Sequence, residues 1–504
     1  MKKITLWIMF FTLGSKILGF TRDIILSYYY GASYISDAYL VSQLIPMSIL
    51  EFIGLGLLTG YIPIYDDIDN KLGKEKSQKF TNTVVCIIIL VSTVMILFGF
   101  VFTKNIVLVF ASGFERETLV LAIGFTRITL FTIYFVTLGY VFKGYLQVHG
   151  KYLVPILAGI PLNIIAIIGI IISVKINVMI LAVGSLLSIF VQFLIMLLYS
   201  YKEGYRFQWT MQLQDENIRK LWKLALPMFL GISVNQINVI VDRTLASRIV
   251  VGGISALNYA NRLNFFVQGI FVLSIVTVMY PIMSKLAANQ EMEELKNKIK
   301  ESINGINILL VPTSIGTVIF SEEIIRLLFG RGMFNTDALT MTSVAAIYYS
   351  IGMVAVGLRE ALSRAFYSLQ DTKTPMINAS IGLGINVVLN IILSQYLGIG
   401  GLALATSISA IITTGFLFIN LRKKIGSFGM KQISISFLKF LFASLLMGVF
   451  AKLSFNYFII SLSQTISLLI AIGIGAVSYG VIVYFMKIED VDIIVDVIKK
   501  KLRR

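Results

Sequence analysis

Long apolar runs follow one another along almost the whole chain, separated by short polar connections. A helix that crosses a bilayer needs about 20 apolar residues, and each run has roughly that length. The runs predict fourteen segments, approximately at 5–30, 34–64, 80–103, 119–146, 153–174, 179–200, 222–247, 256–284, 303–320, 339–367, 376–397, 401–421, 436–455 and 465–486. The connections are too short to hold a soluble domain. The pattern therefore predicts an all-α polytopic membrane protein with about 14 transmembrane helices.

Composition agrees with this architecture, and the positions of the basic residues indicate its orientation. Of the 504 residues, 57% are hydrophobic and 14% are charged, and the formal net charge is +17. Loops on one side hold 23 Lys or Arg residues, at 65–79, 201–223, 285–300, 421–431 and 487–504. Loops on the other side hold 6, at 104–118, 174–178, 248–255, 321–338 and 455–464. Because cytoplasmic loops carry the excess of Lys and Arg, we expect both termini in the cytoplasm. Positive charge concentrated in alternate loops also argues against a nucleic-acid partner.

The C-terminal stretch EDVDIIVDVIKKKLRR, residues 489–504, combines apolar residues at helical spacing with a basic cluster. One interpretation is a helix that lies along the anionic inner leaflet, to which each Lys or Arg adds about 1 kcal/mol. The other is a simple stop-transfer cluster of charges.

The two halves of the chain resemble each other at a nearly constant spacing. Pro63 and Pro281 are 218 residues apart, and Pro155 and Pro375 are 220 residues apart. The stretches NIVLVFASGF and IIRLLFGRGMF resemble each other at an intermediate spacing. Each match falls at the same place in the order of segments. We therefore predict an internal repeat.

A repeat of this length holds six helices, so both copies enter the membrane from the same side. They are then parallel repeats related by an axis along the membrane normal. The expected division is an N-terminal lobe at 1–215, a second lobe at 216–430, and two further helices with the basic tail at 431–504. Two bundles around a central cavity are an arrangement suited to alternating access.

Several ionisable residues fall within or beside the predicted helices. Such residues cost about 2.5–3.5 kcal/mol each at membrane depth, so they normally face protein or water and mark function. Lys16 and Asp23 are seven residues apart and share a helix face. Glu360 and Arg364 form an i,i+4 pair in the favourable order, which we interpret as structural. The ionisable residues within or beside the helices include eight cations and five anions: Lys16, Arg22, Arg127, Lys143, Arg243, Arg262, Arg359 and Arg364, with Asp23, Asp37, Glu51, Asp242 and Glu360. Because cations outnumber anions and the arginine fork favours phosphate, we expect a cavity for an anionic substrate.

The helix at 256–284 carries a polar stripe at helical spacing, which should face the cavity rather than lipid. Its members are Asn258, Asn261, Arg262 and Gln268.

Catalytic chemistry finds little support in the sequence. Cys86 is the only cysteine and His149 the only histidine, which excludes a disulfide framework and a Cys/His metal cluster within the chain. We find neither a glycine-rich phosphate loop nor a nucleophile–base arrangement. The protein is not expected to be an enzyme.

Several motifs together resemble those of the MurJ/MviN family. They are SKILGFTRD at 15–23, ALNYANRL at 256–263, REALSRAFYSLQDTKTP at 359–375 and GIGGLALATSIS at 398–409. The resemblance covers essentially the whole chain. It implies membership of the multidrug/oligosaccharidyl-lipid/polysaccharide exporter superfamily. It also implies a flippase that moves lipid II, the undecaprenyl-pyrophosphate-linked peptidoglycan precursor, from the inner to the outer leaflet of the bacterial plasma membrane.

The resemblance also implies substrate-binding residues. Arg22 and Asp23 match the family's Arg-Asp pair on the first helix, and Asp37 matches the aspartate after the first outer turn. Arg262 matches a cavity arginine in the eighth segment. Lys16 stands where the family usually has arginine, which keeps the charge but loses the paired donor geometry.

A larger departure from the family pattern follows Pro46. Relatives carry arginine or lysine and then glutamate, whereas this chain has PMSILEFIGLG, with Leu50, Glu51 and Leu55. A cavity cation is lost and an anion appears beside it. This difference leaves room for a different polyprenyl-pyrophosphate-linked saccharide.

A sodium site in the second lobe is a further expectation, because the resembled family includes members with such a site. Its ligands would be Asp242, Asn386, Asn390 and Thr406, with backbone carbonyls near Leu402. Oxygen ligands of this kind suit a hard cation such as Na⁺. Alternatively, Asp242 pairs with a cavity arginine and the asparagines hold helices together. No other cofactor is expected.

The sequence thus predicts a two-lobed flippase for an anionic lipid-linked precursor, surrounded by bacterial inner-membrane lipids, in an undetermined oligomeric state. One alternative is an exporter of another lipid-linked oligosaccharide, for capsule or teichoic-type polymers. Another is a cation-coupled drug exporter. A polyprenyl glycosyltransferase would need paired acidic residues in a sizeable loop, and an inactive scaffold would leave the charges within the helices unexplained.

Overall fold

The computed structural model describes residues 2–212 and 214–486, apart from the side chains at 2–6, 9, 49–56, 59 and 224–235. These residues form eighteen helices and no strand, which confirms the all-α prediction. The chain forms two compact units. Unit 1 contains Met1–Ser255 and Arg331–Asn335, and unit 2 contains Ala256–Gly330 and Thr336–Arg504. The surface helix predicted near the C-terminus lies outside the described residues.

Unit 1 holds the first ten helices. They are α1 (Lys2–Tyr30), α2 (Tyr34–Leu72), α3 (Lys74–Val101), α4 (Thr103–Phe110), α5 (Arg116–Thr129), α6 (Thr132–Val148), α7 (Leu153–Leu157), α8 (Gly159–Lys175), α9 (Ile180–Lys202) and α10 (Glu216–Ile249). Unit 2 holds the others, apart from the first turn of α11. They are α11 (Gly253–Ala288), α12 (Met292–Ile319), α13 (Ser321–Leu328), α14 (Thr336–Ser368), α15 (Lys373–Leu397), α16 (Ile399–Ile425), α17 (Met430–Phe458) and α18 (Gln464–Phe485).

Fourteen long helical segments correspond to the predicted spans, with α5 and α6 forming one segment and α7 and α8 another. In the part of the chain that the structure describes, eleven of them, all except α1, α2 and α10, are long and apolar enough to cross a membrane. The short helices α4 and α13 lie where the sequence analysis expected only outer loops. Each carries apolar residues at helical spacing and continues directly from the preceding long helix.

The order of the helices repeats, as predicted. α2, α3 and α4 begin at residues 34, 74 and 103, and α11, α12 and α13 begin at 253, 292 and 321, which is 219, 218 and 218 residues later. Pro63 and Pro281 lie inside the equivalent helices α2 and α11. α17 and α18 follow the second copy. α10 is the first helix of that copy, yet it belongs to unit 1 because it packs along α2.

Aromatic side chains fill one end of unit 1. Tyr61 stacks on Phe80 with ring centroids 5.7 Å apart, and the ring of Tyr65 meets that of Tyr145 edge-on at 5.6 Å. Tyr205, from the loop after α9, is fully buried in the same cluster. Its hydroxyl donates to an Asn82 side chain at 2.8 Å. A buried tyrosine needs such a partner, so the cluster fixes the loop as well as the helices.

Residues 331–335 complete unit 1 from far along the chain. The Met333 N–H donates to the carbonyl of Tyr28, at the end of α1, over 2.9 Å. Gly31 and Gly332 make this approach possible, since both have positive φ. A Cβ on Gly31 would lie 2.4 Å from the Met333 oxygen, and a Cβ on Gly332 would lie 2.2 Å from the Tyr28 oxygen. Only glycine fits at these two positions.

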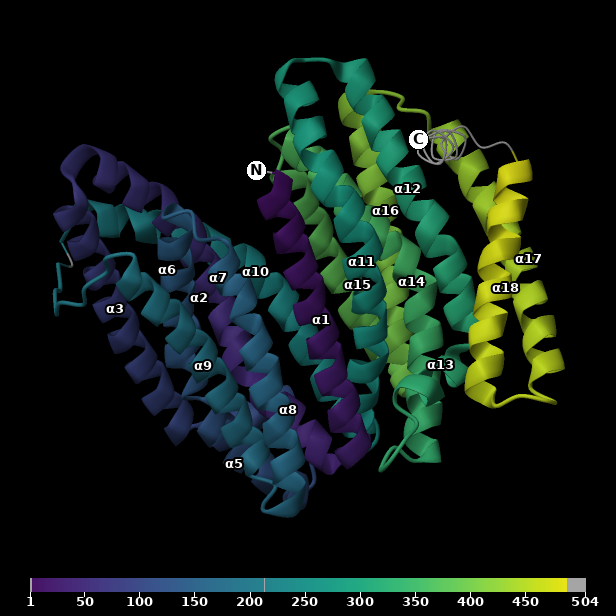
Figure 1. The fold of residues 1–504 in the computed structure, drawn as a ribbon, viewed down its shortest axis with the longest axis horizontal. Helices are drawn as coiled ribbons and strands as arrows, with labels where there is room; N and C mark the ends of the chain where they lie inside the picture. The colour runs from purple at the N-terminus through teal and green to yellow at the C-terminus, as the bar shows by residue number, and fades with distance from the viewer. Residues whose placement is uncertain (1, 213, 487–504) are drawn as a thin grey trace. The chain divides into compact units, whose positions relative to one another are not determined.

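In unit 2, α14 packs against α12 and α16, and α15 packs against α16. α17 and α18 form an antiparallel hairpin that lies against α12 (Figure 1). Lys452 of α17 pairs with Glu323 of α13, with Nζ and Oε1 3.0 Å apart. The Lys452 ammonium also lies 5.2 Å from the ring centroids of Phe320 and Phe455. These contacts attach the hairpin to α13, in the middle of the second repeat.

Candidate functional site

Asp37, in the first turn of α2, holds the N-terminus of α11. The residue is 1% exposed. Its Oδ2 accepts from the Gly252 N–H at 2.8 Å, and its Oδ1 accepts from the Ser255 N–H at 2.8 Å and from the Ser255 hydroxyl. N–H groups at a helix start lack intrahelical partners and attract negative charge. We call Asp37, Gly252 and Ser255 the Asp37 latch.

A second set of contacts closes the same end of unit 1. The Gly113 N–H donates to the Ser247 hydroxyl at 3.0 Å, and Arg248 Nε donates to the Ser112 hydroxyl at 2.7 Å. These bonds join the loop after α4 to the end of α10. With residues 331–335 and the Asp37 latch, they link the turns that the sequence analysis placed on the outer side. Unit 1 is therefore fastened at the end opposite its aromatic cluster.

Arg22 and Asp23 of α1 form an ion pair. Arg22 Nη2 lies 3.0 Å and Nε 3.2 Å from Asp23 Oδ1. The side chains are 21% and 5% exposed. Both donors therefore bind one carboxylate oxygen. Lys16 and Asp23, which were predicted to share a helix face, form no hydrogen bond or ion pair with each other. The Lys16 side chain is exposed.

The polar stripe of α11 belongs to unit 2. Arg262 is exposed, whereas Asn258 is buried and its Nδ2 has no hydrogen-bond partner among the described residues. Gln268 Nε2 donates to Asn264 Oδ1 at 3.1 Å, one turn away. The structure thus keeps Arg262 accessible and gives the stripe an additional member, Asn264. This asparagine also lies on the helical face that the sequence indicated.

Three of the four predicted sodium ligands lie together within unit 2. Asn390 Nδ2 donates to Asn386 Oδ1 at 2.7 Å, and Asn386 Nδ2 donates to the Thr406 hydroxyl at 3.3 Å. Thr406 in turn donates to the Leu402 carbonyl at 3.1 Å. These oxygens fit a hard cation in type. The fourth predicted ligand, Asp242, is half-buried on α10 in unit 1.

Two other sequence predictions have different outcomes. Glu360 and Arg364 form the predicted pair, with Oε1 2.7 Å from Nη2, which confirms it. The departure at Leu50, Glu51 and Leu55 falls among side chains outside the described part of the structure.

Fourteen long helical segments, twelve of which form two repeats, with charged and amide side chains among their buried residues, define a polytopic membrane transporter. The sequence profile described as lipid II flippase MurJ matches residues 26–486. The chain belongs to that family.

Individual relatives agree over nearly the full length. The probable lipid II flippase MurJ of Thermotoga maritima is 31% identical over 489 residues, which cover 96% of each chain. The lipid II flippase MurJ of Thermosipho africanus is 30% identical over 412 residues, covering 82% of this chain and 84% of the relative.

Solved structures give the same result for the fold. A lipid II flippase MurJ in an inward closed conformation superposes with a TM-score of 0.84 at 27% identity, covering 95% of this chain and 98% of the other. An inward-facing multidrug resistance MATE family transporter superposes with a TM-score of 0.71 at 16% identity, covering 82% and 95%. The second similarity concerns the fold alone.

Proposed function

We propose that this protein moves lipid II from the inner to the outer leaflet of the bacterial plasma membrane by alternating access. Support comes from its membership of the lipid II flippase family over residues 26–486. The observation that carries the mechanism is the Arg22–Asp23 pair, in which one carboxylate oxygen takes two arginine donors. A substrate pyrophosphate offers several oxygens to the same planar fork, so it can replace Asp23 without leaving a cation unpaired.

The second phosphate contact in this proposal comes from Arg262. The residue is exposed, and its helix carries the amide groups that keep a polar path free of lipid. Lys16, two turns before Asp23, adds a point charge for the saccharide-bearing headgroup. Asp23 then receives Arg22 again when the substrate leaves. The transport cycle includes no catalytic step.

In this proposal, the Asp37 latch belongs to the state of the transport cycle that is closed on the outer side. In the proposed orientation both termini face the cytoplasm, so the latch and residues 331–335 keep the outer side closed. Opening outward then requires the α11 N-terminus to leave Asp37. Three hydrogen bonds to a buried carboxylate make that step costly, at roughly 1.5–3 kcal/mol for each bond with a charged group. Substrate contacts must supply this free energy in the outward state.

Sodium is the coupling ion in this proposal. The hydrogen-bonded chain of Asn390, Asn386, Thr406 and the Leu402 carbonyl presents oxygens at one place between α15 and α16. An ion that takes these oxygens would replace the asparagine donors and change how the two helices pack. Asp242 would supply the negative charge. The alternative role of the same residues is to join the two helices by hydrogen bonds.

A second candidate substrate is another polyprenyl-pyrophosphate-linked oligosaccharide. The observation that favours it is the altered charge pattern, with Lys16 in place of arginine and Glu51 after a lost cation.

Rescue of cells depleted of their own lipid II flippase tests the function. We expect the wild-type chain to restore growth, and a failure despite normal membrane insertion would favour the other oligosaccharide. Arg22→Ala and Arg262→Ala should each abolish rescue, and Arg262→Lys should impair it because the fork is lost. Arg219→Ala, at an exposed position outside the spans, is the matched control and should rescue fully. Normal growth with both alanine variants would contradict the binding proposal.

A further inference from the structure

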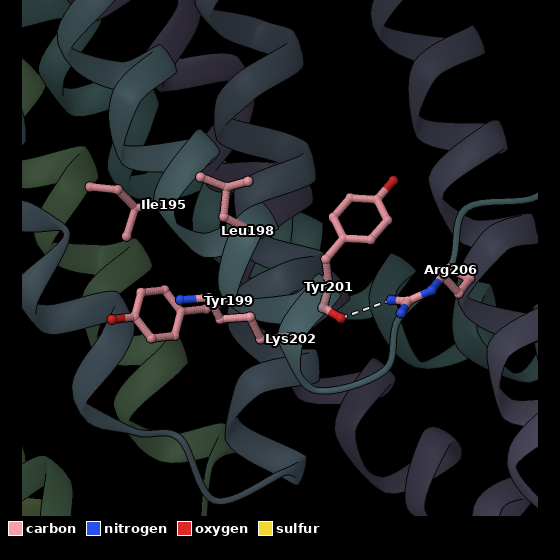
Figure 2. A pocket seen from close by; sticks show the side chains of 6 residues that line it. All are labelled: Ile195, Leu198, Tyr199, Tyr201, Lys202 and Arg206. Atoms are coloured by element: carbon pink, nitrogen blue, oxygen red, sulfur yellow. Dashed lines mark hydrogen bonds between the residues drawn. The ribbon is translucent and has the colours of Figure 1, made fainter.

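A pocket of about 590 Å³ lies at the end of α9, away from the Asp37 latch and the Arg22–Asp23 pair. Figure 2 shows the six side chains that surround it. They are Ile195, Leu198, Tyr199, Tyr201, Lys202 and Arg206. The lining is mainly apolar, and both of its charges are positive.

The protein holds the arginine of this pocket in place. Arg206 Nη1 donates to the carbonyl of Tyr201 at 2.8 Å (Figure 2). It also donates to the carbonyl of Tyr205 at 2.8 Å, so the remaining N–H groups of Arg206 are on Nε and Nη2. The backbone is fixed as well, because Asn82 Nδ2 donates to the Arg206 carbonyl at 3.0 Å. Gln78 likewise donates to the Gly204 carbonyl at 2.8 Å. The guanidinium is therefore positioned before any ligand arrives.

The lysine is positioned by an aromatic ring. Lys202 Nζ lies 5.0 Å from the centroid of Tyr199, a distance typical of cation–π contact. The neighbouring acidic residue does not cancel this charge, since Glu203 pairs with Lys151 at 3.0 Å. Two cations thus stand beside an apolar wall of Ile195 and Leu198.

The chain that follows has the character of a membrane-interface segment. Phe207, Trp209 and Met211 alternate with polar residues and are 41%, 70% and 42% exposed. Amphipathic aromatic side chains gather at the level of lipid headgroups. In the orientation proposed above, on which this inference rests, the segment lies at the inner leaflet.

We propose that this pocket binds one anionic phospholipid of the inner leaflet. The lipid phosphate takes the free donors of Arg206 and the ammonium of Lys202, and one acyl chain lies along Ile195 and Leu198. Charge complementarity favours this occupant, because the inner leaflet is anionic and each nearby cation adds about fivefold to the affinity. The apolar wall distinguishes a lipid from a free phosphate. The lipid would fasten the loop between the two repeats to the membrane surface.

Native mass spectrometry of the purified full-length protein in detergent tests this site. Titration compares phosphatidylglycerol with phosphatidylcholine of the same acyl chains. We expect one phosphatidylglycerol to bind roughly 25-fold more tightly, given two cations near the headgroup at about fivefold each. In the Lys202→Gln/Arg206→Gln variant the two lipids should bind within about twofold of each other. The charge-preserving Lys202→Arg/Arg206→Lys variant should keep the preference, which separates loss of charge from misfolding.

The matched control is Lys74→Gln/Lys76→Gln, which removes the same charge from the exposed first turn of α3. It should keep the preference for phosphatidylglycerol. If the control variant lost the preference for phosphatidylglycerol to the same extent, the preference would come from general attraction to basic loops, and the proposed site would be wrong. An unchanged preference in Lys202→Gln/Arg206→Gln would do the same. Glycerol phosphate should not displace the lipid, and full displacement by it would identify a site for free anions instead.

Discussion

Lys424 Nζ lies 2.7 Å from Asp371 Oδ2, and this pair joins the end of α16 to the turn before α15. The first repeat has a pair in the equivalent place, with Lys151 Nζ 3.0 Å from Glu203 Oε1. In the first repeat the turn carries the basic partner and the helix end carries the acidic one. In the second repeat the charges are exchanged. The two repeats therefore preserve the ion pair without preserving the charge at either position.

Exchange of charge within the first pair should be tolerated. Lys151→Glu alone places two carboxylates together and should lower stability by up to about 1 kcal/mol, the range for partly exposed pairs. Adding Glu203→Lys should restore most of that loss. Thermal unfolding of the two single variants and the double variant in detergent gives the interaction free energy between the two side chains. A double variant as unstable as the two losses combined would mean that the pair contributes nothing.

The second pair should give a pH dependence of stability. The hydrogen bond from Lys424 lowers the pKa of Asp371 to about 2, and Thr374 donates to the same carboxylate. Because the folded pKa lies below the unfolded value of about 3.9, the stabilisation is complete above that value and disappears as pH falls toward 2. Asp371→Asn should be less stable than wild type at pH 6, by up to about 1 kcal/mol. The gap should narrow below pH 4 in unfolding experiments across that range, and a constant gap would contradict the assignment.

Weakening the Asp37 latch should favour the outward-open state. In a Cys86→Ser background, Asn258→Cys introduces a thiol at a position that is 9% exposed in this conformation. Asp37→Ala removes three hydrogen bonds to a charged group, so labelling from the outer side should accelerate by roughly tenfold or more. Asp67→Ala is the control, because Asp67 lies on the same helix in a surface pair with Lys71. Equal labelling rates in the two variants would remove the latch from the proposed cycle.

The sodium proposal separates from a structural role only when ion dependence is measured. Flipping into vesicles by the wild type should rise with Na⁺, and Asp242→Asn and Asn386→Ala should each lose that response. Asn420→Ala is a matched control, because Asn420 donates to Asn378 at 3.4 Å and joins the same two helices elsewhere. If the Asp242 variant flips slowly but keeps the wild-type response to Na⁺, the residue is a structural ion-pair partner.

Local patterns predicted the fold well. The long spans follow from runs of apolar residues, and the Glu360–Arg364 pair follows from helical spacing, because both depend only on near neighbours in the sequence. The placement of Pro63 and Pro281 inside equivalent helices follows from the repeat. The residues of the candidate site remain predictions, and their family resemblance was the main guide to them.

Contacts distant in the sequence were not predictable in the same way. Asp37 reaches Ser255, 218 residues further on, and no local pattern indicates that this carboxylate will cap another helix. Asp23 was expected on a face with Lys16, yet its adjacent arginine turns back onto it, because a long side chain can cross the angle between successive helical positions. The pocket of Lys202 and Arg206 depends on how α3 holds the loop after α9. The periodicity of apolar residues carries no information about these tertiary contacts.

The glycine contact between the end of α1 and residues 331–335 has a consequence for biosynthesis. The ribosome makes α1 first, but the Met333 N–H that caps the Tyr28 carbonyl is made some three hundred residues later. Throughout that interval the Gly31 turn lacks its final neighbour. A chain released before Arg331 would contain every long helix of unit 1 and still lack the segment that completes it. Translation of the second repeat is thus a step in folding the first.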